Sequence, residues 1–236
     1  EDFYGGGQLH KHALKYFPDL VFVIADDEEN DPHGLLDRAA GHALASLGNP
    51  YTQDLITDKP MFYKAINKML ADKHSASIRA SGMALIAAEM PLEDFHYVAD
   101  MVVHVSRGTD PEYTVYRGCS QGTENGVGLL KRLNIHEAVE ILIDSFPTAT
   151  RGKERARRLA LLESFGANAK PYLPRLKAAL EKDLNPDPEA EKSAGFTKDV
   201  PLHKHIIEEL IQTIEKSTDP PKKMISLEEA IQVGLD

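Results

Sequence analysis

Hydrophobic residues recur every three or four positions along most of the chain, which is the pattern of amphipathic helices. Phe62, Ile66 and Met69, for example, lie at positions i, i+4 and i+7 of one segment. The only candidate strand, residues 114–116, has no second strand to pair with. The pattern therefore predicts an all-α protein. The expected helices span residues 9–16, 20–27, 33–47, 60–73, 77–90, 126–133, 135–146, 153–165, 170–184 and 202–216, with one more after Pro91 and a short one after Ser226.

Three of these segments are similar to one another. They begin at Arg38, Arg79 and Ala156, and each has apolar residues six and nine positions after its start. The starts lie 41 and 77 residues apart, which is close to one and two units of a roughly 40-residue repeat of helix pairs. A degenerate copy is expected between the second and third, at residues 126–133 and 135–146. Such pairs stack because one pair cannot bury its apolar face alone. An irregular helical bundle is the alternative that the pattern leaves open.

Two copies also place an Asp seven residues before the Arg: Asp31 before Arg38, and Asp72 before Arg79. In these features residues 31–184 resemble the HEAT-repeat family. The resemblance implies an α-α superhelix, a HEAT-like solenoid of about four antiparallel helix pairs, in which a turn Asp and a helix Arg can bond in successive layers. It also implies a non-enzymatic protein-binding or scaffold module, with a protein as its partner.

The resemblance extends to residues 171–180, which look like the second helix of a pair. The third copy departs from the pattern, because Ala149 and Ala156 replace the Asp and the Arg. Outside the repeat region we expect an N-terminal lead-in with short helices at residues 1–30. A polar linker with C-terminal capping helices is expected at residues 185–236.

Composition limits the function further. Hydrophobic residues make up 42% of the 236 residues, enough for a substantial core, and the net charge of −10 disfavours binding to nucleic acids and to anionic membranes. The most apolar run, near residues 80–88, is much shorter than the roughly 20 residues that span a membrane. A single cysteine excludes a disulfide framework within the chain and leaves the compartment unknown. Because the chain begins at Glu1 rather than Met, we expect it to be part of a larger protein.

The longest stretch without helical periodicity, residues 107–125, is the first candidate binding surface. Loops of this length inside a compact fold are often functional, although a simple insertion between repeats is the alternative. Tyr113, Tyr116 and Arg117 are the expected anchors, because Tyr and Arg are enriched at binding hot spots. The glycines in and after this stretch do not form a phosphate-binding loop, since no Gly-Lys-Ser/Thr follows them.

Residues 151–177 are the second candidate, because they carry eight Lys and Arg against two Glu, a net charge of +6 in an acidic chain. Arg155 and Arg157 are the residues expected to attract an acidic partner. Binding of an anion or a nucleic acid is an alternative function for this segment, and a merely solvated helix face is another. We also expect Arg158 to lay its aliphatic stem over the core while its charge reaches solvent.

No pattern predicts a metal ion, a cofactor or a catalytic site. In each of the two His-x-His pairs the histidines point to different helix faces, which is a poor geometry for a shared metal ion. His136-Glu137 is a single His-Glu dipeptide, whereas HEAT-like deoxyhypusine hydroxylases bind iron through several. Cys119 lacks any protease signature and is expected to be an inert thiol. A hydrolase or lyase that combines the 107–125 loop with His104 remains an alternative, and it requires His104 and Cys119 to meet in one pocket.

Overall fold

The computed structural model describes residues 14–26, 39–41, 43–44, 55–71, 76–107, 120–146, 152–185 and 204–235. In these ranges all regular structure is helical, and extended backbone pairs only in one parallel bridge between Ile135 and Ile225. The prediction of an all-α protein is confirmed. The candidate strand at residues 114–116 lies outside the described residues.

The elements agree with most of the predicted helices and refine their ends. The residues after Pro91 form a 3-10 helix and then an α-helix, rather than one continuous helix. In chain order the α-helices are α2 (Phe17–Asp26), α4 (Lys59–Leu70), α5 (Ala76–Ala87), α6 (Ala99–Arg107), α8 (Ser120–Arg132), α9 (Glu137–Asp144), α10 (Gly152–Glu163), α11 (Leu173–Ala179), α12 (Glu181–Leu184), α14 (Lys204–Lys216) and α15 (Leu227–Gln232), while the 3-10 helices η2 (Leu92–Tyr97) and η4 (Gly166–Tyr172) precede α6 and α11.

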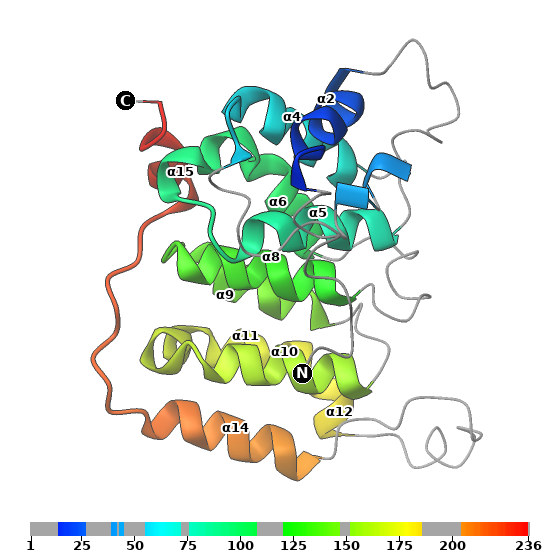
Figure 1. The fold of residues 1–236 in the computed structure, drawn as a ribbon. Coiled ribbons are helices and arrows are strands. Elements are labelled where there is room, and N and C mark those ends of the chain that lie inside the picture. The colour runs from blue at the N-terminus through cyan, green and yellow to red at the C-terminus, as the bar shows by residue number, and fades with distance from the viewer. Residues whose placement is uncertain are drawn as a thin grey trace, which may run out of the picture.

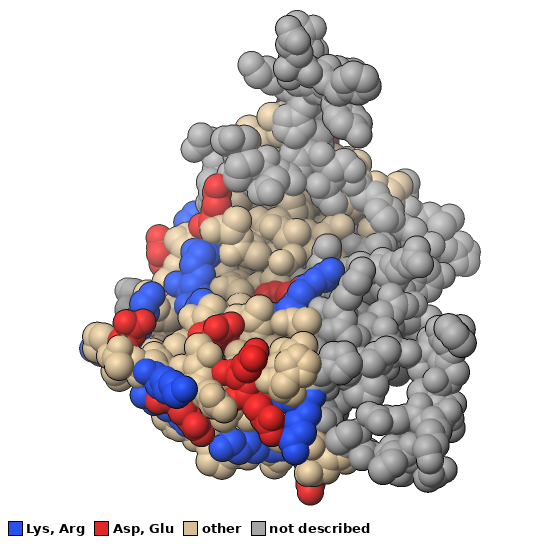
Figure 2. Space-filling model, turned by 90° about the horizontal axis from the view of Figure 1, so that it is seen from below, with Lys and Arg blue, Asp and Glu red and all other residues tan. Residues whose placement is uncertain are grey.

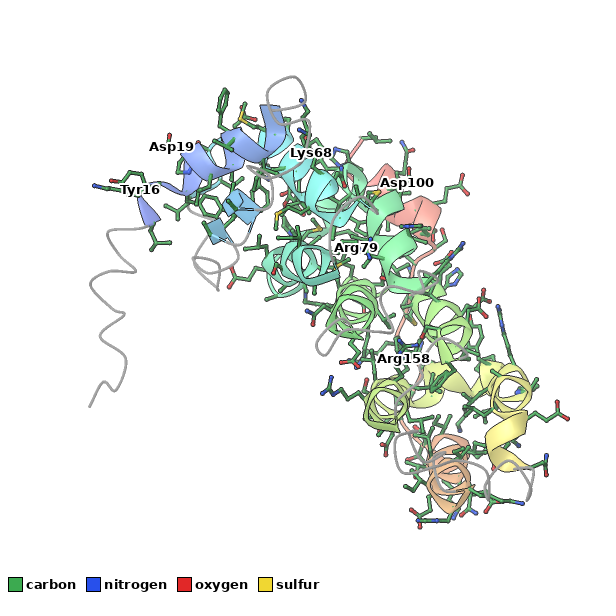
Figure 3. The ribbon with its side chains drawn as sticks, turned by 90° about the vertical axis from the view of Figure 1, so that its right-hand side faces the viewer. Tyr16, Asp19, Lys68, Arg79, Asp100 and Arg158 are labelled. Carbon is green, nitrogen blue, oxygen red and sulfur yellow. The ribbon has the colours of Figure 1, made fainter. Side chains whose placement is uncertain are left out.

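The principal helices lie in two rows, seen nearly end-on in Figure 3. One row contains α5, α8, α10 and α14, and the other contains α4, α6, α9 and α11, with neighbours in contact along each row. Across the rows α4 packs on α5, α6 on α8, and α9 on α10. One hydrophobic core runs between the rows, and Figure 1 shows α2 and α14 at its opposite ends.

Helix α8 begins at Ser120, so the prediction of an irregular stretch through residue 125 is wrong for residues 120–125. Gly126 lies inside this helix, where packing against a neighbouring helix requires a residue without a side chain. A Cβ at Gly126 would overlap the hydroxyl of Ser106 in α6. Gly82 of α5 has the same role, because its Cβ would lie 3.0 Å from Cβ of Met69 in α4. In both helix pairs a glycine allows close approach across the rows.

Two arginines lie inside the stack, Arg79 on α5 and Arg158 on α10 (Figure 3). Arg158 is only 3% exposed, and its guanidinium donates to the carbonyl of Ser145 at the end of α9. The expectation that its charge reaches solvent is therefore wrong, because a buried carbonyl takes the place of water. The predicted Asp–Arg ladder involves Asp31, Arg38 and Asp72, which lie outside the described residues.

The C-terminal region packs on the helical stack. Helix α14 covers the last layer, and the segment after it runs back along one edge to place α15 against η2 (Figure 1). Asn168 exchanges two hydrogen bonds of 2.9 Å with the backbone of Lys222. The carboxylate of Glu137 accepts from the N–H of Leu227 at 2.9 Å, which fixes the start of α15. Residues 217–235 therefore connect the two ends of the stack.

Candidate functional site

The structure describes few of the predicted binding residues. Tyr113, Tyr116 and Arg117 lie outside the described residues, as does Cys119, so neither the loop surface nor a meeting of Cys119 with His104 is tested. Arg155 belongs to α10 by its backbone, but its side chain is not described. Arg157 is exposed on α10, where its guanidinium lies 3.5 Å from the carboxylate of Glu124.

The basic side chains of residues 157–177 that the structure describes all have partners. Arg175 donates to both carboxylate oxygens of Asp144, at 2.6 and 2.8 Å, and lies 3.3 Å from Glu140. Lys170 donates to the carbonyl of Ser217 at 2.6 Å, and Lys177 lies 3.3 Å from Glu215. Figure 2, viewed from the α14 end, shows basic and acidic side chains intermixed on that face. Among the side chains that the structure describes in this segment, three positive charges therefore lie beside carboxylates, and the other two bond to carbonyls.

Two other kinds of site find no support in the described ranges. No three His, Cys, Asp or Glu side chains there lie together in a way that could hold a metal ion. None of the helices in these ranges combines the length and the apolar character needed to cross a membrane.

A hollow of about 520 Å³ lies beside α4, and we call it the α4 hollow. Most of its lining comes from one face of α4, because the residues follow one another at helical spacing along the helix and its C-terminal cap. Tyr97 of η2 forms the opposite wall. The lining residues are Pro60, Tyr63, Lys64, Asn67, Lys68, Ala71 and Tyr97.

A buried carboxylate holds the two walls together. Asp94 of η2 is only 4% exposed, and it accepts from the ammonium of Lys59 and from the hydroxyl of Tyr63, both at 2.9 Å. Burial and this hydrogen bond raise the pKa of Tyr63 above its ordinary value of 10.0, so its hydroxyl stays protonated and donating. The hydrogen bond to Asp94 likewise raises the pKa of Lys59.

Two further contacts fix the hollow. The amide of Asn67 donates to the carbonyl of Tyr97 at 2.7 Å. The rings of Tyr63 and Tyr97 stack with centroids 5.1 Å apart and planes inclined by 13°. With the Asp94 contacts, these interactions hold η2 against α4, and the hollow is preformed.

Two polar groups of the hollow have no partner. The Nζ atom of Lys68 and the Oδ1 atom of Asn67 are both buried, and neither forms a hydrogen bond. The Lys68 residue is only 9% exposed, and Figure 3 shows it on α4, at the end of the stack that carries α2 and α15. Buried polar groups are nearly always satisfied, and an unsatisfied one calls for an explanation such as a ligand. The site offers one ammonium donor and one amide acceptor beside aromatic rings.

A second and larger hollow, of about 820 Å³, lies between η4 and the C-terminal segment, and it includes Tyr172 and Lys222. Its main polar side chains, Asn168 and Lys170, are already bonded to that segment. Nδ1 of His136, which also lines this hollow, is buried without a hydrogen bond and lies 3.5 Å from the carboxylate of Glu137. The α4 hollow is the better candidate for a binding site, because a buried donor and a buried acceptor without partners lie on adjacent residues of its wall.

Sequence reasoning did not identify Asn67, Lys68 or Tyr97 as site residues. One signal was present, since α4 has three lysines and no acidic residue in an acidic chain. Comparisons of the chain with protein-family models, with curated proteins and with solved structures gave no match. The resemblance to HEAT repeats therefore rests on the sequence features described above.

Proposed function

We propose that this protein is a non-enzymatic protein-binding or scaffold module, built as a HEAT-like stack of helix pairs. The two rows of helices support this interpretation, because pairs across the rows share one core and neighbours follow in sequence order. Gly41, Gly82 and Gly126 add support. They follow one another after 41 and 44 residues, and each lies close to a neighbouring helix where a side chain would crowd it. This spacing agrees with the roughly 40-residue repeat expected for such proteins.

The binding surface that we propose is the α4 hollow. One observation carries this proposal: the ammonium of Lys68 and the amide oxygen of Asn67 are buried in a preformed hollow without partners. A partner segment would supply the missing groups and pack against the ring of Tyr97. Aromatic residues in such positions are frequent binding hot spots. Tyr113, Tyr116 and Arg117 are a separate candidate surface, because they lie outside the described residues.

Selection of binding peptides from a random displayed library, followed by calorimetric titration, tests this function. We expect peptides that bind the wild-type protein and lose affinity on the order of tenfold or more when Tyr97 is replaced by Ala. Tyr172→Ala is the matched control, because Tyr172 is also half-buried and lines the other hollow.

Two results would count against the proposal. Failure to recover any peptide would remove the binding function at this surface. Peptides that depend on Tyr172 and ignore Tyr97 would place the binding surface at the C-terminal segment instead.

A further inference from the structure

We propose that the α4 hollow binds a carboxylate of an acidic peptide segment, with Lys68 as the residue that receives it. This inference rests on the protein-binding function proposed above and adds the chemistry of the partner. Lys68 supplies the donor to the carboxylate, Asn67 accepts from a neighbouring main-chain N–H of the peptide, and Tyr97 packs against an adjacent side chain.

Lys68 is the reason to expect an anion. An ammonium taken out of water without an acceptor is costly, and a carboxylate that reaches it supplies the missing interaction. The surrounding charge favours the same ligand, because Lys59, Lys64 and Lys68 are the only charged residues of α4. The charge of Lys59 is already paired with Asp94, whereas Lys64 is exposed at the rim. An acidic segment would therefore meet two uncompensated positive charges.

Asn67 is the reason to expect a peptide rather than a phosphate group. Its amide nitrogen donates to the carbonyl of Tyr97, while its buried oxygen, an acceptor, has no partner. An acceptor repels the oxygens of a phosphate, which has no donor to offer when fully ionised. A peptide carries a main-chain N–H close to every carboxylate, so it can satisfy Asn67 and Lys68 together.

The dimensions suit a short extended segment. The lining runs from Pro60 to Ala71, a length of about 17 Å at the helical rise of about 1.5 Å per residue. An extended peptide of about five residues covers this length at about 3.3 Å per residue. The open face of α4 therefore accommodates a linear segment rather than a single side chain.

The test uses the peptides recovered in the selection described above, capped at both ends and titrated against the full chain. Replacing the acidic residue of a peptide by Gln should lower its affinity by at least about 30-fold, because truncating one partner of a buried charge pair leaves the other unpaired. A peptide with Gln at that position and a free C-terminal carboxylate distinguishes a side-chain carboxylate from a terminal one. Recovery of binding with the free terminus would identify the terminal group as the ligand.

Variants of the protein, combined with the peptide variants, give a double-mutant cycle. Lys68→Met should reduce binding of the acidic peptide by the same factor and leave binding of the Gln peptide nearly unchanged, whereas Lys68→Arg should retain part of the affinity. Lys64→Met removes the same charge one helical turn away from an exposed position, and it should cost less than about fivefold. Because the Lys68 ammonium has no partner to lose, Lys68→Met should be at least as stable as the wild type in urea unfolding.

Three results would overturn the inference. Acidic and Gln peptides could bind equally well, Lys64→Met could cost as much as Lys68→Met, or inorganic phosphate at submillimolar concentration could displace the peptide. If binding still required Tyr97 in these cases, the protein-binding function would stand and only its carboxylate chemistry would be wrong. If binding required neither Tyr97 nor Lys68, both proposals would fail.

Discussion

Replacing Tyr63 by Phe tests whether the buried carboxylate of Asp94 holds η2 against α4. The Tyr63 side chain is 1% exposed, and its hydroxyl donates to Asp94 at 2.9 Å. A hydrogen bond to a charged group contributes about 1.5–3 kcal/mol. Phe keeps the ring and its stacking, and Asp94 keeps Lys59, so we expect the lower part of this range, about 1.5–2 kcal/mol. For a protein of this size the melting temperature should fall by about 3–8 °C.

Urea unfolding followed by far-ultraviolet circular dichroism measures this loss. Tyr97→Phe is the matched control, because the Tyr97 ring is in the same stack and its hydroxyl forms no hydrogen bond in the described part of the chain. That change should alter the free energy of unfolding by less than about 0.5 kcal/mol. Equal effects of the two substitutions would refute the reasoning, since ring packing alone would then account for the contribution of Tyr63.

The stability of the protein at alkaline pH is a second test of the hydrogen bond between Tyr63 and Asp94. Burial and the bond to Asp94 raise the pKa of Tyr63 in the folded state above the ordinary 10.0. The contribution of a group with a raised pKa is complete below its unfolded pKa and is lost as pH rises toward the folded value. Above pH 10.0 the wild type should therefore lose stability more steeply than Tyr63→Phe. Identical slopes for the two proteins would contradict this assignment.

Two further predictions concern Arg158 and Glu229. Arg158→Met should cost about 1.5–3 kcal/mol, because the carbonyl of Ser145 loses a buried donor. Arg157→Met removes an exposed guanidinium that lies 3.5 Å from the carboxylate of Glu124, and it should cost less than about 1 kcal/mol. Chemical denaturation compares the two variants, and equal costs would contradict the buried role of Arg158. The hydrogen bond from the Ser226 N–H lowers the pKa of the Glu229 carboxyl below 4.5 in the folded state. The contribution of this carboxylate to the start of α15 is therefore complete above pH 4.5, and it is lost as the pH falls through the lowered pKa of the folded state. Glu229→Gln, which can still accept that hydrogen bond, should reduce the acid dependence of the α15 amide chemical shifts, and an unchanged pH profile would assign the effect to other groups.

Hydrophobic periodicity predicted the helices well because burial of one face determines them. Phe95, Val98, Val102 and Val105, for example, recur at three- or four-residue spacing as one apolar stripe, and each is at most 2% exposed. The same periodicity did not predict the change from η2 to α6 within that stripe. At that point the carbonyl of Tyr97 accepts from Asn67, a residue 30 positions earlier in the sequence. Such a contact depends on how two helices meet, which no local pattern encodes.

The misplaced start of α8 has a similar cause. Glycine inside a helix is unfavourable by about 1 kcal/mol relative to alanine, so the local sequence around Gly126 gives little support to a long helix. The structure shows that Ser106 of α6 leaves no space for a side chain there. The residue that explains Gly126 is 20 positions away and on another helix. Local propensity and tertiary packing therefore disagree at this position, and packing determines the result.

Tertiary contacts also decide which basic segment, residues 151–177 or α4, is the better candidate binding site. Counting residues favoured the segment at 151–177, with its net charge of +6. In the folded chain, however, Arg157, Arg175 and Lys177 each lie beside a carboxylate from another helix of the stack. Helix α4 has fewer charges, yet Lys68 is buried there without a partner. Because only an uncompensated charge gains from a ligand, the number of unpaired groups left after folding is a better guide to a binding site than local net charge. The α4 hollow is therefore the first surface on which an acidic partner should be tested.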